Sequence, residues 1–169
     1  MGHFTRDAVD EMNARPSRIH FICAVNKEEV FQRVLLRSLE QNRHASLTKV
    51  VGAGSAAEAF NAHVGSHPRD AITVLVHQDV YLPPGWTDRM EAIFDHTAFG
   101  VAGCVGATSA GFFADVYASP NHYLDFNIGS LPAPVDSLDE LLLAFPSNTP
   151  IRLSPELGWH MYGAEACTL

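Results

Sequence analysis

Apolar runs alternate with segments of helical periodicity along the first hundred residues. Residues 18–25 (RIHFICAV) and 72–77 (ITVLVH) are nearly continuous in apolar character, which is typical of strands that are covered on both faces. A shorter run over 47–54 (LTKVVGAG) ends in glycines, and a fourth apolar run covers 99–106 (FGVAGCVG). The pattern predicts four strands in this part of the chain.

The segments between these strands have the spacing of helices. Over 27–42, apolar side chains recur at helical intervals behind an acidic first turn. Ser55 and Glu58 have the spacing of a capping box for a helix over 56–67, and a third helix is predicted over 85–96. Strands that alternate with helices predict an α/β fold, a three-layer sandwich with a mostly parallel central sheet.

The second part of the chain has weaker periodicity. Residues 107–134 are rich in Gly, Ser, Pro and aromatic residues, and we predict a long excursion with little regular structure. A strand or short helix is predicted over 135–146, and a helix over 158–169. We expect residues 1–17 to form an N-terminal arm, followed by a single domain over 18–169.

Composition, net charge and cysteine content limit the classes of function that the chain can have. The 169 residues are 47% hydrophobic and 18% charged, which is enough apolar material for a core without disulfides. The formal net charge of -8 disfavours nucleic acid as a partner, because an acidic surface repels the phosphate backbone. Three scattered cysteines, no signal-peptide core and no apolar run of spanning length predict a cytoplasmic protein without a membrane span.

Polar or small residues follow three of the predicted strands, at 26–28, 52–55 and 77–79. The carboxyl ends of parallel strands meet at one edge of a sheet, and ligands of α/β proteins bind in the crevice outside that edge. We therefore expect these three segments to converge in space, although they are distant in the sequence.

The sequence His77-Gln78-Asp79 carries the strongest chemical signal. A buried strand delivers these residues to a tight Pro-Pro-Gly turn. One carboxylate together with substrate phosphates is the usual site for Mg²⁺, and Mn²⁺ also accepts an imidazole. Asp79 and His77 are therefore candidate ligands of Mn²⁺ or Mg²⁺. The alternative is that Asp79 only caps the loop and His77 packs beside it.

Three further residues each have two interpretations. Asn26 follows a strand, where it reads the edge of a base or caps the next helix. Asn61 stands among small residues, which allow close approach of a ligand or tight packing of a helix on a sheet. Glu165 has apolar and small neighbours, so it is a general base with a raised pKa or a solvated helix acid.

Five segments in order resemble the glycosyltransferase-like branch of the family-two glycosyltransferases. They are AVNKEE, VVGAGSAAEAFNAHV, VLVHQDVYLPPGW, VDSLDELLLAFP and LSPELGWHMYGAEACTL, of which HQDVYLPPGW and GWHMYGAE are the most specific. The resemblance covers about Ile19 to Leu169 and implies a glycosyltransferase-A fold, that of nucleotide-diphospho-sugar transferases. Such enzymes usually continue beyond the last of these segments, so it also implies a fragment, a minimal domain or a member that binds without turnover.

The resemblance also assigns roles to residues. Nucleotide-sugar contacts are implied for Asn26, Glu28, Asn61, His77, Gln78 and Asp79. The family's acid-any-acid metal motif corresponds to His77-Gln78-Asp79, in which the last acid is kept and His replaces the first. Glu165 corresponds to the catalytic base, which is usually Asp. The acceptor side is expected to hold Trp86, Asp139, Trp159 and His160.

The implied reaction is inverting transfer of a sugar from a UDP- or GDP-sugar donor to a hydroxyl of a glycan or other acceptor, assisted by Mn²⁺ or Mg²⁺. The alternative is a non-catalytic nucleotide-sugar-binding module, or a degenerate glycosyltransferase domain within a larger assembly. The incomplete acid motif and the short C-terminal region favour this alternative. An unrelated phosphoryl-transfer or hydrolytic enzyme is disfavoured because the chain has no P-loop and no nucleophile elbow.

Overall fold

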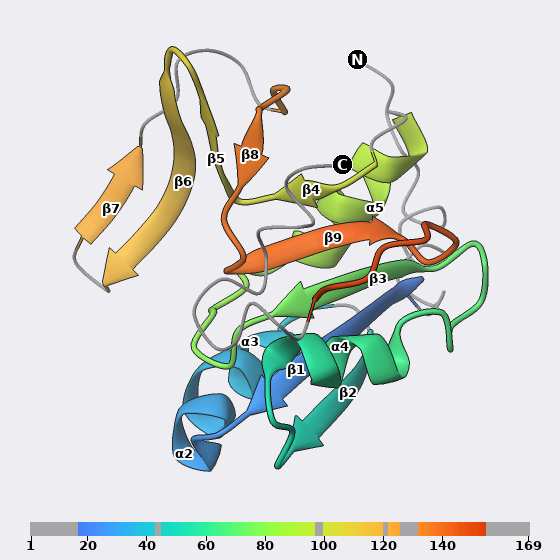
Figure 1. The fold of residues 1–169 in the computed structure, drawn as a ribbon. Coiled ribbons are helices and arrows are strands. Elements are labelled where there is room, and N and C mark those ends of the chain that lie inside the picture. The colour runs from blue at the N-terminus through green and yellow to red at the C-terminus, as the bar shows by residue number, and fades with distance from the viewer. Residues whose placement is uncertain (1–16, 43–44, 97–99, 120–121, 126–131, 155–169) are drawn as a thin grey trace, which may run out of the picture.

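The computed structural model describes residues 17–42, 45–96, 100–119, 122–125 and 132–154, which form two sheets and their covering helices (Figure 1). The first sheet has the order β2-β1-β3-β9-β4 and the second has the order β7-β6-β5-β8. The strands of the first sheet are β1 (Ile19–Val25), β2 (Ser46–Val51), β3 (Ile72–Val76), β4 (Ala102–Gly103) and β9 (Leu142–Pro146). Those of the second are β5 (Val105–Thr108), β6 (Gly111–Ser119), β7 (His122–Asp125) and β8 (Ser137–Leu138).

The first sheet is mostly parallel, as predicted. β1 pairs in parallel with both β2 and β3, whereas β9 runs antiparallel to β3 and to β4. All strands of this sheet except β9 therefore point the same way. The described part of the chain is a mixed α/β structure built on this sheet.

Helices pack on both faces of the first sheet. They are α2 (Glu28–Phe31), a π-helical turn (Gln32–Leu36), α3 (Arg37–Leu39), α4 (Ala56–His63) and α5 (Trp86–His96). The first three follow one another directly and fall within the single helix predicted over 27–42. α4 begins at Ala56 with Ser55 as its N-cap, as the capping pattern predicts, and ends at His63, before the predicted end at residue 67.

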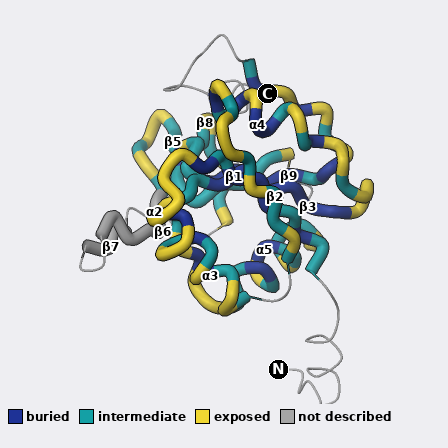
Figure 2. The backbone as a smooth tube through the Cα atoms, turned by 90° about the horizontal axis from the view of Figure 1, so that it is seen from below, coloured by how far each residue is buried: buried dark blue, intermediate teal, exposed yellow. Residues whose placement is uncertain are grey.

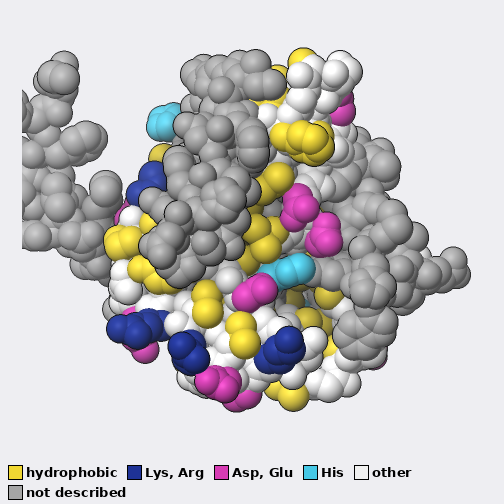
Figure 3. Space-filling model, turned by 90° about the vertical axis from the view of Figure 1, so that its left-hand side faces the viewer, with side chains coloured by type: hydrophobic (Ala, Val, Ile, Leu, Met, Phe, Trp, Pro, Cys, Tyr) yellow, Lys and Arg dark blue, Asp and Glu magenta, His cyan; other side chains and the backbone are white. Residues whose placement is uncertain are grey.

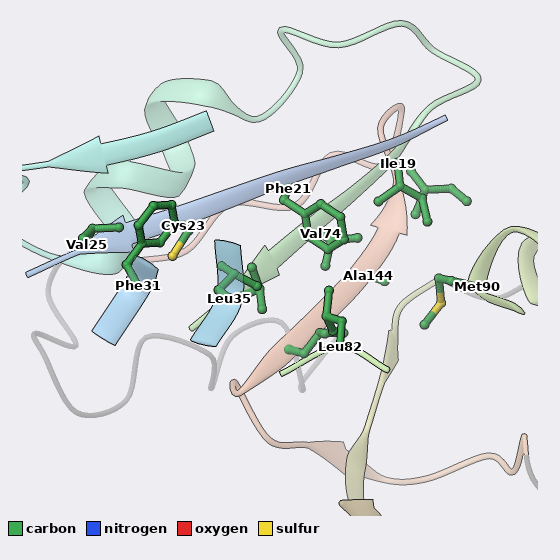
Figure 4. Close-up of a cluster of buried hydrophobic side chains, with 13 residues drawn as sticks. Ile19, Phe21, Cys23, Val25, Phe31, Leu35, Val74, Leu82, Met90 and Ala144 are labelled. Atoms are coloured by element: carbon green, nitrogen blue, oxygen red, sulfur yellow. The ribbon is translucent and has the colours of Figure 1, made fainter. Parts of the chain in front are cut away.

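Alternate residues of β1 face opposite cores, because successive side chains of a strand point to opposite faces. One core joins the β1 residues Ile19, Phe21, Cys23 and Val25 to Phe31, Leu35 and Met90 of the helices on that side (Figure 4). The other joins Ile22 of β1 to Ala57 and Phe60 of α4. The strands at the centre are buried on both faces, as their continuous apolar runs predict (Figure 2).

Two predictions about the second part of the chain are wrong. The fourth strand predicted over 99–106 is divided between the sheets, because β4 joins the first and β5 the second. The excursion predicted over 107–134 contains β6 and β7, which extend the second sheet as an antiparallel hairpin. Cross-strand pairing stabilises this hairpin, and a composition rich in Gly and Ser does not reveal such pairing. The segment 135–146 forms strands, one of the two predicted options.

The connections of the first sheet place its binding edge. β1 leads through the helices over 28–39 to β2 on one side, and β2 leads through α4 to β3 on the other side of β1. The two crossovers use opposite faces of the sheet, since these helices belong to different cores. Such a reversal of strand order opens a crevice at the carboxyl ends of the strands.

Candidate functional site

A cleft of about 510 Å³ opens where β1, β2 and β3 end. Three strand ends and the loops after them line it, together with the start of α4. The residues are Ala24, Val25 and Asn26 at the end of β1, Val50, Val51, Gly52 and Ala53 at the end of β2, Ser55 and Ala56 at the start of α4, and Leu75, Val76, His77, Gln78 and Asp79 at the end of β3. The convergence of the three predicted strand ends is thereby confirmed. Figure 3 views the side toward which these strands point, where a histidine and acidic side chains lie together.

The cleft has aliphatic walls and a polar rim. Val50 and Ala56 pack on the core beneath α4, and Leu75 is part of it. Val51 is 68% exposed, which leaves an apolar side chain open to solvent at the cleft. Apolar walls with a few polar groups at one side are the usual composition of a small-molecule site.

The loop between β2 and α4 is shaped by a glycine and a cap. Gly52 has a φ of 76°, a conformation that side chains disfavour, so the chain turns there at low energetic cost. Ser55 Oγ accepts a hydrogen bond from Glu58 N at 3.1 Å, and Glu58 Oε2 accepts one from Gly54 N at 2.7 Å. The capping box is therefore present, with its reciprocal bond one residue earlier than the usual pattern.

His77 and Asp79 lie side by side at the rim. His77 Nδ1 is 4.0 Å from Asp79 Oδ1, and their side chains are 32% and 63% exposed. The backbone of His77 is held by its N–H, which donates to Leu141 O at 3.1 Å. Within the described residues, no group of three His, Cys, Asp or Glu side chains is arranged to hold a metal ion. One carboxylate beside one imidazole is a donor set that fits a site in which phosphate and water supply most ligands.

Asn26 and Gln78 bond to each other across the cleft edge. Gln78 Oε1 accepts from Asn26 N at 3.1 Å and from Lys27 N at 3.0 Å, while Gln78 Nε2 donates to Asn26 Oδ1 at 2.5 Å. The N-cap of α2 is Lys27, and it makes no side-chain cap bond. Asn26 therefore bonds to the neighbouring strand end, and its predicted alternative role as a helix cap is not observed.

Two predicted nucleotide-sugar contacts lie outside the cleft lining. Glu28 forms an ion pair with Lys49 Nζ at 2.6 Å, and Gln32 donates a hydrogen bond to it at 2.8 Å. These two partners, Gln32 first, lower the pKa of the Glu28 carboxyl. Asn61 bonds through its side-chain amide to the backbone of Leu153 at 2.6 and 3.0 Å. Both side chains are occupied by internal partners.

Of the predicted acceptor-side residues, the structure describes Trp86 and Asp139. Trp86 packs against Phe21 with the rings tilted by 41° and their centroids 5.6 Å apart, beside the core on the face opposite α4. Asp139 Oδ1 accepts from Leu141 N at 2.9 Å, and Leu141 in turn accepts from His77 N, so Asp139 is connected to the end of β3. Trp159, His160 and the predicted base Glu165 lie outside the described residues, as does the predicted helix over 158–169.

The sequence placed the β2–α4 loop at the crevice but assigned it no ligand contact. Gly52, Ala53 and Ser55 line the cleft, but none of them was a candidate ligand residue. Small residues directly before a capping box at a strand end were the available signal, since they leave room for a ligand beside the first helical turn.

The two described cysteines are poor nucleophiles. Both are free thiols. Burial, with a smaller effect of Asp79, raises the pKa of Cys23 to about 12, and burial raises the pKa of Cys104 to about 11. Cys23 lies in the core, where a thiol packs as a small apolar residue. Neither thiol lines the cleft, and a raised pKa disfavours the thiolate form of both.

No protein-family model and no curated protein matches the chain. Among the residues that the structure describes, no helix has the length and apolar character needed to cross a bilayer. The function is therefore inferred from the cleft and from the resemblance noted in the sequence.

Proposed function

We propose that the chain is a cytoplasmic domain of the glycosyltransferase-A type, a three-layer sandwich that binds a UDP- or GDP-sugar with Mn²⁺ or Mg²⁺. It transfers the sugar with inversion to a hydroxyl of a glycan or other acceptor. One observation carries the proposal: the ends of β1, β2 and β3 converge on one cleft, and His77 and Asp79 stand at its rim.

The distribution of groups in the cleft supports a nucleotide-sugar. The aliphatic walls suit the flat face of a base, and the start of α4 presents backbone N–H groups where a diphosphate gains from the helix dipole. Among the described residues that line the cleft, Asp79 is the only carboxylate and His77 the only imidazole. A bare diphosphate beside Asp79 would be repelled, which is the electrostatic reason for a bridging cation.

Asp79 and His77 are the residues that would hold the ion. The ion would neutralise charge on the departing diphosphate. In the transfer, the acceptor oxygen forms a bond to the anomeric carbon as the bond from that carbon to the diphosphate oxygen breaks. The proton of the acceptor hydroxyl passes to a carboxylate, for which the sequence offers Glu165.

A second candidate function is a nucleotide-sugar-binding module without turnover. The observation that favours it is the rim itself, where the described residues provide one carboxylate and one imidazole rather than two acids. Such a module would bind donor in the same cleft and act within a larger assembly.

Calorimetric titration with UDP and with GDP, each with and without Mn²⁺, tests the proposal. We expect binding of one nucleotide to tighten by at least about tenfold, or 1.4 kcal/mol, when Mn²⁺ is present. Asp79→Asn should remove this dependence, whereas Asp70→Asn, an exposed acid away from the cleft lining, should keep it. Absence of binding by the wild-type protein under all four conditions would refute both candidate functions.

Glu165→Gln separates the two candidates. If the chain is an enzyme, this variant should bind donor as the wild type does and lose transfer or donor hydrolysis. If the wild type binds donor but neither transfers nor hydrolyses it, the binding module is the correct function. An equal loss of binding in Glu165→Gln would show that Glu165 contacts the donor and is not the base.

A further inference from the structure

The side chain of Gln78 points away from its own strand and toward β1. Its carbonyl oxygen accepts from two backbone N–H groups, of Asn26 at 3.1 Å and Lys27 at 3.0 Å, and its amide nitrogen donates to Asn26 Oδ1. Both hydrogen-bonding ends of the amide are therefore used within the protein. A side chain bonded in this way has little capacity left for a ligand.

These bonds join the strands beyond the end of their ladder. The registered pairs of β1 and β3 run from Ile19–Ile72 to Ile22–Leu75, several residues before Asn26 and Gln78. Beyond this last pair, β1 stays paired with β2 as far as Val25 and β3 with β9 as far as Val76, but the ladder no longer joins β1 to β3. Gln78 makes that connection across 52 residues of sequence.

The turn that carries Asp79 is held to β9 and to itself by backbone bonds. His77 N donates to Leu141 O at 3.1 Å and Val80 N donates to His77 O at 3.3 Å, while the Asp79 side chain is 63% exposed. Neither backbone bond joins the turn to β1, so the position of the Asp79 carboxylate relative to β1 depends on the residue that precedes it. Gln78 is that residue, and its amide is fixed to the end of β1.

We propose that Gln78 is a positioning residue, which sets the distance between Asn26 and Asp79 on the two sides of the cleft and does not contact the ligand through its amide. This inference rests on the proposed function, because the spacing matters for a ligand that bridges both strand ends. The three bonds are solvent-exposed, and water replaces exposed bonds at small cost. Their loss should therefore affect the geometry of the cleft more than the stability of the fold.

Two substitutions of Gln78 and one control test this role. Gln78→Leu keeps the approximate size of the side chain and removes all three bonds. Gln78→Glu keeps an acceptor for the two backbone N–H groups, and rotation of the Asn26 amide restores the third bond. Gln41→Leu is the control, since Gln41 also joins distant segments through one exposed bond, from Tyr81 Oη at 3.0 Å, but does not line the cleft.

The first measurement is amide hydrogen exchange at Asn26 and Lys27, which needs no ligand. We expect faster exchange at both positions in Gln78→Leu, recovery in Gln78→Glu and no change in Gln41→Leu. The second is the affinity for UDP and GDP with Mn²⁺. We expect at least about tenfold weaker Mn²⁺-dependent binding in Gln78→Leu, partial rescue in Gln78→Glu, and melting temperatures similar to that of Gln41→Leu.

Three results would overturn the role. Unchanged exchange in Gln78→Leu would show that the strand ends do not depend on the amide. Tighter nucleotide binding in Gln78→Leu would show that Gln78 blocks the site. If Gln78→Leu loses the same nucleotide affinity with and without Mn²⁺, and Gln78→Glu does not restore it, then the Gln78 amide contacts the nucleotide directly.

A wild-type protein that binds neither nucleotide would refute the proposed function, and a metal probe then decides the role of Gln78. Mn²⁺ alone broadens the amide signals of residues near its site. Weaker broadening around Asp79 in Gln78→Leu would support positioning, whereas broadening equal to that of the wild type, or none in either protein, would overturn it.

Discussion

The side-chain amide of Asn61 bonds to both backbone groups of Leu153, a residue 92 positions later. Nδ2 donates to Leu153 O at 2.6 Å, and Leu153 N donates to Oδ1 at 3.0 Å. The pair joins α4 to the segment that follows β9, and Leu153 itself belongs to the core beneath α4. Asn61, which the sequence resemblance assigned to the nucleotide-sugar, thus joins two distant parts of the chain by hydrogen bonds.

Asn61→Ala should destabilise the fold without changing the cleft. The substitution leaves the N–H and C=O of Leu153 without these partners in a partly buried place, which costs about 1–3 kcal/mol of the free energy of unfolding. Urea unfolding would measure that loss. At a temperature where the variant is folded, its nucleotide affinity should equal that of the wild type. A lower affinity in a variant of unchanged stability would show instead that Asn61 contacts the ligand.

The stacked imidazoles of His20 and His67 should make stability depend on pH. Their ring centroids are 4.1 Å apart, Ser46 Oγ bonds to His20 Nδ1, and His63 lies close enough to act on His67. Burial lowers the pKa of both below 6.5, and the neighbouring histidines lower that of His67 further. The unfolded chain then takes up protons first, so this stability is present above about pH 6.5 and lost as the pH falls toward the folded pKa.

Replacement of one ring isolates this effect. His67→Phe keeps an aromatic stack but cannot take up a proton, so its melting temperature should fall less than that of the wild type between about pH 7.5 and 5.5. His96→Phe, at the end of α5, is the matched control and should follow the wild type. Equal slopes for His67→Phe and the wild type would exclude the stacked pair as the source of the pH dependence.

A buried hydroxyl pair couples β3 to the segment after β9. Thr73 Oγ1 and Ser147 Oγ are 2.7 Å apart, and both residues are buried. Thr73→Val should cost about 1–3 kcal/mol because it leaves the Ser147 hydroxyl buried without this partner. Thr73→Val combined with Ser147→Ala should cost less than the sum of the single substitutions, since no hydroxyl is then left over. Additive losses in urea unfolding would mean that the two hydroxyls do not interact.

The first half of the fold could be predicted because each of its signals is local. Continuous apolar runs over β1 and β3 require cover on both faces, and the spacing of Ser55 and Glu58 fixes the start of α4. Parallel strands with helical crossovers then determine which edge holds a site. The cleft and its rim residues His77 and Asp79 follow from these facts without any knowledge of the side-chain contacts.

The parts of the fold and of the site that the sequence did not predict depend on contacts between residues that are distant in the sequence. Nothing near Glu28 in the sequence shows that Lys49 will be its partner, and nothing near Trp86 shows that Phe21 will cover its ring. β6 and β7 form because two segments pair across a turn, which apolar periodicity does not record. Residue types at strand ends therefore predicted where the cleft lies, but not which polar side chains bond within the protein.

Substitution of Ser55 should separate the stability of α4 from binding in the cleft. Ser55 caps this helix and also lines the cleft. Ser55→Ala removes the cap and should lower the free energy of unfolding by about 0.5–2 kcal/mol. Ser55→Asp keeps an acceptor for the Glu58 N–H and a negative charge favourable to the helix N-terminus, so its stability in urea should equal that of the wild type.

The same Asp places a charge where the proposal puts the diphosphate. Ser55→Asp should therefore weaken binding of UDP or GDP in the presence of Mn²⁺ by at least about tenfold, because like charges repel at close range. The loss should shrink in high salt, since ions screen this repulsion. Undiminished affinity in Ser55→Asp would mean that the start of α4 does not face the diphosphate, and the donor would then have to lie along the β1 side of the cleft.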